Sequence, residues 1–222
     1  RKLAISIESE TLPRDPPGII ALGNALREHA GLQEFSWIDF CVQLDAVQVI
    51  STLDPVLRAL PACPHLQKVV IMTKCVSAAA MQNLLQLRPA TDLRLILETE
   101  QWLAVANEIR HGRCNVQRLT LAMLKGESSM ATEAVKAVAS ASKLDHNLKY
   151  LTLQMENGFA DEVGVALAEA LMVNKTLSRI SMSVDCCPYR AHRASLGAPA
   201  YEAFSAMLRV NTSLILELPP FG

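Results

Sequence analysis

A short pattern of apolar positions recurs along the whole chain and constrains its fold more than any other feature. The pattern is L-x-x-L-x-L, and its clearest copies are residues 32–37, 66–71, 116–121, 148–153 and 177–182. Weaker copies, in which the first position is polar, are residues 2–7, 92–97 and 213–218. One unit therefore spans about 30 residues, which is the spacing of a repeat protein. The uneven spacing between copies predicts insertions in the connections.

Helical patterns fill the segments between these copies. Residues 163–171 place Val163, Leu167 and Leu171 on one face of a helix. Comparable patterns cover residues 19–29, 44–60, 76–88, 100–110, 129–144 and 199–210. Strands that alternate with helices predict a parallel sheet with the helices outside it. Because a single unit cannot bury its own apolar face, the units are expected to stack on one another.

The junction between each predicted helix and the next strand carries a second repeated mark. Asn174 precedes Leu177 by three residues, Asn211 precedes Leu214 in the same way, and Asn147 stands before Leu148. The tenth position, counted from the start of a copy, holds Cys41, Cys75, Asn157 and Cys186.

In these marks the chain resembles leucine-rich-repeat proteins of the ribonuclease-inhibitor subclass. The resemblance implies an α/β fold, a right-handed solenoid or horseshoe of about eight repeats. Its parallel β-strands would form the concave face and its α-helices the convex face. Residues 1–222 would form a single leucine-rich-repeat domain, either complete or part of a longer chain. The copies that begin at Lys2, Asp92 and Ser213 depart from the pattern at their first position and are degenerate repeats.

Composition excludes several classes of protein. Half of the residues are hydrophobic, 19% are charged and the net charge is −1, which excludes a mainly disordered chain. No apolar run approaches the roughly 20 residues that span a bilayer. The six cysteines in so apolar a chain do not indicate a disulfide scaffold, so a reducing, intracellular compartment is expected. The cytoplasm is the predicted location, or an organelle if a targeting segment has been removed.

The sequence offers no support for catalysis. The local cluster of Cys186, Cys187 and His192 lacks the spacing of a zinc site, and no C-x-x-C pair is present. No phosphate-binding glycine loop and no order of nucleophile, base and acid stands out. We therefore predict no enzyme activity, no cofactor and no metal site. The glycosylation sequons at Asn174 and Asn211 fall on the helix-to-strand junctions, so a structural role is predicted for both.

The concave face is the predicted binding surface, because alternate residues of a strand face opposite sides. The third position of successive copies reads Ala4, Glu34, Lys68, Arg94, Arg118, Tyr150, Arg179 and Ile215. This register places Lys68, Arg94 and Arg118 on adjacent strands, and such a row of like charges predicts an acidic protein partner. An apolar patch of Ile38, Val70, Met72 and Ile96 is predicted beside it. The predicted partner-binding residues are Lys68, Val70, Met72, Arg94, Ile96, Arg118, Tyr150 and Arg179.

The predicted function is that of a non-catalytic protein–protein interaction scaffold, which binds through the concave sheet or as a subunit of a larger assembly. The resemblance also implies two regulatory alternatives, a regulator of a GTPase and a sensor module of an innate-immunity receptor. Nucleic-acid binding through the basic column is a further alternative. A net charge near zero and a single aromatic on the face, Tyr150, argue against it.

The two ends of the array lack recognisable capping units. The first copy begins close to Arg1, and the last runs into Pro219 and Pro220, which would block pairing at that edge. The N-terminal edge is therefore expected to be covered by further residues, by a partner subunit or by another copy of the chain.

Overall fold

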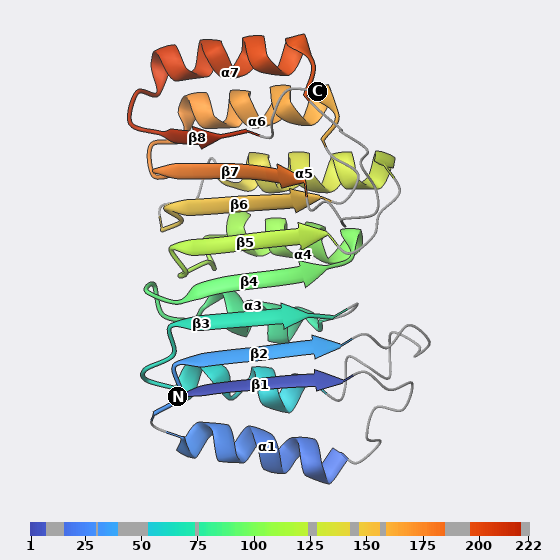
Figure 1. The fold of residues 1–222 in the computed structure, drawn as a ribbon, viewed down its shortest axis with the longest axis vertical. Helices are drawn as coiled ribbons and strands as arrows, with labels where there is room; N and C mark the ends of the chain where they lie inside the picture. Colours follow the sequence, from blue (N-terminus) through green and yellow to red (C-terminus); the bar gives the residue numbers. More distant parts are fainter. Residues whose placement is uncertain are drawn as a thin grey trace.

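One parallel sheet runs through the protein in the computed structural model (Figure 1). The structure describes residues 1–7, 16–29, 31–39, 53–73, 76–123, 128–142, 147–155, 159–184 and 196–218. The sheet has eight strands, and their order in space is their order in the chain. The strands are β1 (Lys2–Ile7), β2 (Glu34–Asp39), β3 (Lys68–Met72), β4 (Asp92–Leu97), β5 (Arg118–Met123), β6 (Tyr150–Met155), β7 (Arg179–Val184) and β8 (Ile215–Glu217). The predicted α/β class and repeated parallel strands are confirmed.

Helices connect consecutive strands and lie along one side of the sheet (Figure 1). They are α1 (Pro16–Glu28), α3 (Ala78–Leu85), α4 (Thr99–Arg110), α5 (Ser128–Ser142), α6 (Asp161–Val173) and α7 (Ala198–Val210). Between β2 and β3 the described chain forms a short helix at residues 53–57 and a 3-10 turn, η1 (Leu60–Ala62). Each of these helices falls within a segment whose sequence predicts a helix, although some extend one to three residues beyond that segment. Residues 44–52 lie outside the described part.

The core fills the space between the sheet and the helices. In β4, Leu93, Leu95 and Leu97 are fully buried and alternate with half-buried residues. The same alternation continues along the array, so each unit adds aliphatic side chains to one continuous core. The two tryptophans, Trp37 of β2 and Trp102 of α4, are the largest side chains in this core, and both are buried. Because only 5% of residues are aromatic, aliphatic packing supplies most of the stabilising burial.

The other side of the sheet carries the half-buried and exposed strand residues, and we call it the open face. No described helix crosses it in Figure 1. In β3, for example, Lys68 is exposed while Val70 and Met72 are half-buried. The predicted partner-binding residues all belong to this face.

Asparagine side chains tie the helix-to-strand junctions before β7 and β8 to the preceding junctions. Oδ1 of Asn174 accepts hydrogen bonds from the backbone N–H groups of Thr176 (2.9 Å) and Leu177 (2.7 Å), and Nδ2 donates to the carbonyl of Ser142. Nδ2 of Asn211 donates to the carbonyls of Leu171 and Asn174, at 2.9 and 3.0 Å.

These bonds explain why the repeat places asparagine at the junction, where the turn leaves backbone groups without partners. Asn174 and Asn211 are 1% and 3% exposed. Both sequon nitrogens are therefore buried and donating, and the fold leaves no room for a glycan on either. The predicted structural role of these asparagines is confirmed.

The cysteines divide into described and undescribed positions. Cys63 and Cys114 are buried in the core, and burial raises the pKa of the Cys63 thiol. Sγ of Cys63 donates to the carbonyl of Leu26 at 3.3 Å, which links the residues after η1 to α1. The predicted tenth-position residues Cys41, Cys75, Asn157 and Cys186 lie outside the described part, as do Cys187, His192, Pro219 and Pro220.

Helices α1 and α7 lie at opposite ends of the stack (Figure 1). Among the described strands, none pairs with the outer edge of β1. What covers this edge remains a prediction. No helix in the described ranges is long and apolar enough to cross a membrane.

We predict that Asn174→Ala lowers the free energy of unfolding by about 2 kcal/mol, because it leaves buried backbone groups without partners. Urea denaturation followed by circular dichroism measures the loss. Asn24→Ala is the control, since Asn24 is exposed on α1 and accepts a bond only from Arg27 among the described residues. It should change stability by less than about 0.5 kcal/mol. Equal losses for the two variants would contradict a structural role for the junction.

Candidate binding surface

The pairing of the strands fixes which side chains meet on the open face. The row that contains Lys68 reads Lys2, Glu34, Lys68, Asp92, Arg118, Tyr150, Arg179 and Ile215. Asp92 therefore lies between Lys68 and Arg118. Arg94 belongs to the next row, where its neighbours are Val70 and Thr120.

The sequence-based register was wrong by two residues in β1 and β4. In the predicted alignment, Ala4 and Arg94 occupied the places that Lys2 and Asp92 hold in the structure. The cause is the strand period of two. Leu93, Leu95 and Leu97 all face the core, so a shift by two residues leaves the buried face unchanged and satisfies the pattern equally well.

The corrected row alternates in charge over its first five strands. Nζ of Lys2 forms an ion pair with Glu34 at 2.8 Å, and the hydrogen bond from Lys2 lowers the pKa of Glu34. Lys68 then has Glu34 on one side and Asp92 on the other. Opposite charges on adjacent strands attract. The predicted row of like charges was therefore wrong, and it supplies no argument for an acidic partner.

The second half of the row is also compensated within the protein. The guanidinium of Arg118 lies over the ring of Tyr150, 4.8 Å from its centroid. Arg179 forms an ion pair with Glu217, and their shared hydrogen bond raises the pKa of Arg179 and lowers that of Glu217. A depression of about 350 Å³ lies here, lined by Asp92, Arg118, Leu119, Thr120, Tyr150, Thr152, Arg179, Ser181 and Glu217.

Aliphatic side chains form a straight row near the carboxyl ends of the strands. Ile38, Met72, Ile96 and Ala122 are neighbours on β2, β3, β4 and β5, and we call them the aliphatic row. Val70 adjoins the row from the same strand as Met72. The apolar patch expected from the sequence is confirmed, and the corrected register places Ile96 beside Met72. Ile38, Met72 and Ile96 remain half-buried, so part of each is accessible.

Arg94 lies beside the aliphatic row and differs from the other cations on the face. Its Nη2 donates to Oε1 of Gln154 at 2.9 Å, so the side chain reaches past β5 to β6. Its Nε is buried and has no hydrogen-bond partner among the described residues. No described carboxylate forms an ion pair with it either. Sequence reasoning selected Arg94 but placed it in the wrong row.

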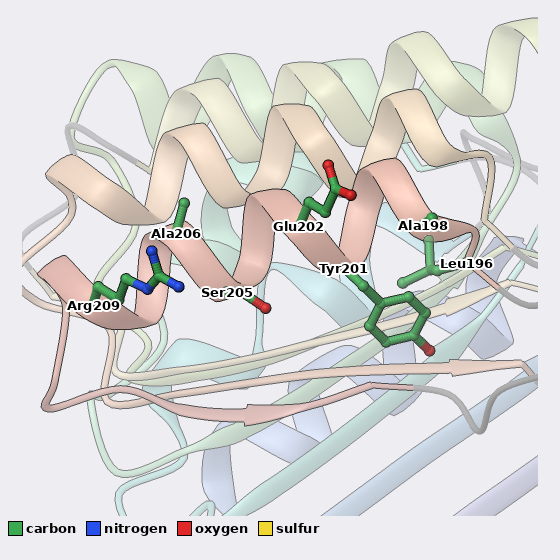
Figure 2. A pocket seen from close by; sticks show the side chains of 7 residues that line it. All are labelled: Leu196, Ala198, Tyr201, Glu202, Ser205, Ala206 and Arg209. Carbon is green, nitrogen blue, oxygen red and sulfur yellow. The ribbon is translucent and has the colours of Figure 1, made fainter.

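A second pocket, of about 630 Å³, lies along α7 at the end of the stack (Figure 2). Tyr201 and Ser205 project from one side of the helix, and Glu202 and Ala206 from the other. Apart from Leu196, its lining comes from α7 alone. This pocket is therefore a surface along the last helix, separate from the open face.

Neither the open face nor the pocket along α7 has the arrangement of a metal site. Within the described residues, no group of three or more His, Cys, Asp or Glu side chains is placed to hold a metal ion. The open face instead offers hydroxyl, guanidinium and carboxylate groups beside aliphatic side chains. These groups suit non-covalent recognition. No protein-family model matches the chain, and no curated protein matches it.

We predict that Asp92→Lys lowers the free energy of unfolding by about 0.5–1 kcal/mol, because it creates three adjacent cations on the sheet. High salt should recover part of the loss by screening the repulsion. Glu169→Lys makes the same change of charge on the exposed side of α6 and should show little effect. Denaturation at low and high salt measures both variants. An Asp92→Lys variant with no salt-dependent loss would contradict the corrected register.

We predict that Arg179→Gln raises the pKa of Glu217, because it removes the hydrogen bond that lowers it. Because the pKa of Glu217 is lowered in the folded state, its ion pair with Arg179 stabilises β8 at pH values above the ordinary pKa of glutamate. This stabilisation is lost as the pH falls through the lowered pKa. An NMR titration of the Glu217 carboxyl measures the shift. Arg209→Gln on α7 is the control and should leave the titration unchanged, whereas equal titrations in the wild type and Arg179→Gln would exclude the pairing.

Proposed function

We propose that this chain is a non-catalytic protein-binding scaffold and that its partner binds the open face. The aliphatic row carries the proposal. Ile38, Met72 and Ile96 leave apolar surface accessible on three adjacent strands of the open face, and Val70 adjoins them. Contiguous apolar surface of this kind marks interaction sites more often than isolated exposed residues do.

The type of sheet supports the same conclusion. Parallel sheets are usually covered on both faces, because their strands expose apolar side chains to both sides. Here the helices cover one face, and the aliphatic row forms a contiguous apolar strip on the other. A partner that covers this row would complete the burial that the helices provide on the opposite face.

The surroundings of the aliphatic row have the composition of a protein interface. Arginine, tyrosine and methionine are enriched in such interfaces, and a polar rim commonly surrounds an apolar centre. Arg118, Tyr150 and Arg179 supply a rim on the side of β5 to β7. The charges of Arg118 and Arg179 are compensated within the protein, so these residues can orient a partner without binding anions non-specifically.

Nucleic acid is less well matched to this surface. A phosphate backbone that followed the row of Lys68 and Arg118 would also meet Glu34 and Asp92. Alternating charges cancel the attraction on which non-specific nucleic-acid binding depends.

A photo-crosslinking amino acid at position 72, compared with position 103 of α4, tests the proposal. Leu103 is an exposed leucine on the helical side, 44% exposed, and serves as the matched site. In extracts of the native source, we expect position 72 to capture a protein that position 103 does not. Capture only at position 103 would place binding on the helices.

The captured protein should then bind the purified chain directly. We predict that Met72→Gln weakens this binding by about tenfold, because a polar group replaces a buried methionine at the interface. Leu103→Gln should leave the Kd unchanged. Isothermal titration calorimetry measures both. Unchanged binding by Met72→Gln would exclude the aliphatic row as the contact, and equal thermal unfolding of the two variants controls for folding.

A further inference from the structure

We propose that Arg94 anchors a carboxylate of the partner, so the segment that binds the open face is both acidic and aliphatic. This inference rests on the proposed function and specifies the chemistry of its partner. It follows from a contrast between Arg94 and the other charged groups on the same face.

The other cations of the open face have compensating neighbours within the protein. Lys2 pairs with Glu34, and Arg179 pairs with Glu217. Lys68 lies between two carboxylates, and Arg118 lies between Asp92 and the ring of Tyr150. An anion that approached one of these groups would compete with an existing partner.

Arg94 has no such compensation among the described residues. Its only described hydrogen bond is with the neutral side chain of Gln154, and its Nε is buried without an acceptor. This Nε is out of reach of an incoming group, so a ligand would bind the Nη hydrogens that the bond to Gln154 leaves unused. A carboxylate is the acceptor that matches these donors best, because its two oxygens can accept two N–H bonds.

The bond to Gln154 also prepares Arg94 for binding. It holds a long side chain across β5, with Thr120 as its neighbour in the row. A guanidinium that is already held loses less conformational freedom when a ligand binds.

The neighbours of Arg94 determine the rest of the partner's chemistry. Ile96 follows it by two residues on β4, and Val70 faces it from β3. Met72 lies beside Ile96. A carboxylate bound at Arg94 therefore has aliphatic side chains on two sides. The matching segment carries one Asp or Glu next to residues such as Leu, Ile or Val.

A library of random short peptides displayed on phage, selected against the immobilised full chain, tests this inference. The most enriched peptide is then synthesised with a fluorescent label, and its Kd is measured by fluorescence polarisation. We expect enriched peptides to share one acidic residue flanked by aliphatic residues. Arg94→Glu should weaken binding by about tenfold or more. Arg110→Glu, the same change at an exposed arginine of α4, should leave it within about twofold.

A charge swap separates a direct contact from an effect on folding. Replacing the acidic residue of the peptide with lysine should restore part of the affinity for Arg94→Glu while abolishing binding to the wild type. If Arg94→Glu fails to fold, Arg94→Gln takes its place, with an expected loss of binding in the same direction. Circular dichroism and thermal unfolding monitor every variant.

The possible failures are distinguishable. Peptides whose binding is weakened by Met72→Gln but unchanged by Arg94→Glu would overturn the anchor and leave the proposed function standing. Enriched peptides that bind through Met72 but contain no acidic residue would likewise overturn the anchor and leave the proposed function standing. If no selected peptide depends on Arg94 or on Met72, the open face does not bind peptide segments, and both the anchor and the proposed function fail.

Discussion

The structure depends on one constraint, that a strand and a helix of about 30 residues cannot bury their apolar faces alone. Burial is achieved only when the next unit packs alongside. Leu93, Leu95 and Leu97 of β4 are fully buried because β3 and β5 flank them and helices cover them. Stacking in chain order then yields one parallel sheet with helices on one side. The opposite face is left for the side chains that alternate with the leucines.

The junction residues convert this stacking into a defined register. Asn174 and Asn211 each bond to the preceding junction, so β7 and β8 each begin at a fixed position relative to the strand before. Thr91 performs a similar role before β4, where its hydroxyl donates to the carbonyl of Leu66 at 3.2 Å. Register in turn decides which side chains become neighbours on the open face. The chemistry of that face is therefore a consequence of hydrogen bonds made at its edge.

On the open face, most charged side chains have a compensating neighbour within the protein, whereas Arg94 has none among the described residues. The aliphatic row is the accessible apolar part of this face. Compensated charges keep the surface polar without committing it to a particular ligand. An accessible apolar strip and a cation with no described carboxylate each gain when a complementary group covers them. They adjoin one another on β3 and β4. The proposed partner segment follows from this adjacency.

The sequence by itself determined the alternation of strands and helices and the face on which each strand residue lies. Apolar residues at period two and period 3.6 report burial directly, so Lys68, Met72, Tyr150 and the core leucines were assigned to the correct sides. Only the tertiary structure decided which residues meet across strands. The leucines of β4 fit the pattern in either of two registers, and the hydrogen bond from the N–H of Asp92 to the carbonyl of Gln67 selects one of them. A shift by two residues keeps every side chain on its face but changes its neighbours on the adjacent strands. In the observed register, Asp92 lies between Lys68 and Arg118, so the charges of that row alternate. The same register leaves Arg94 without a carboxylate among the described residues.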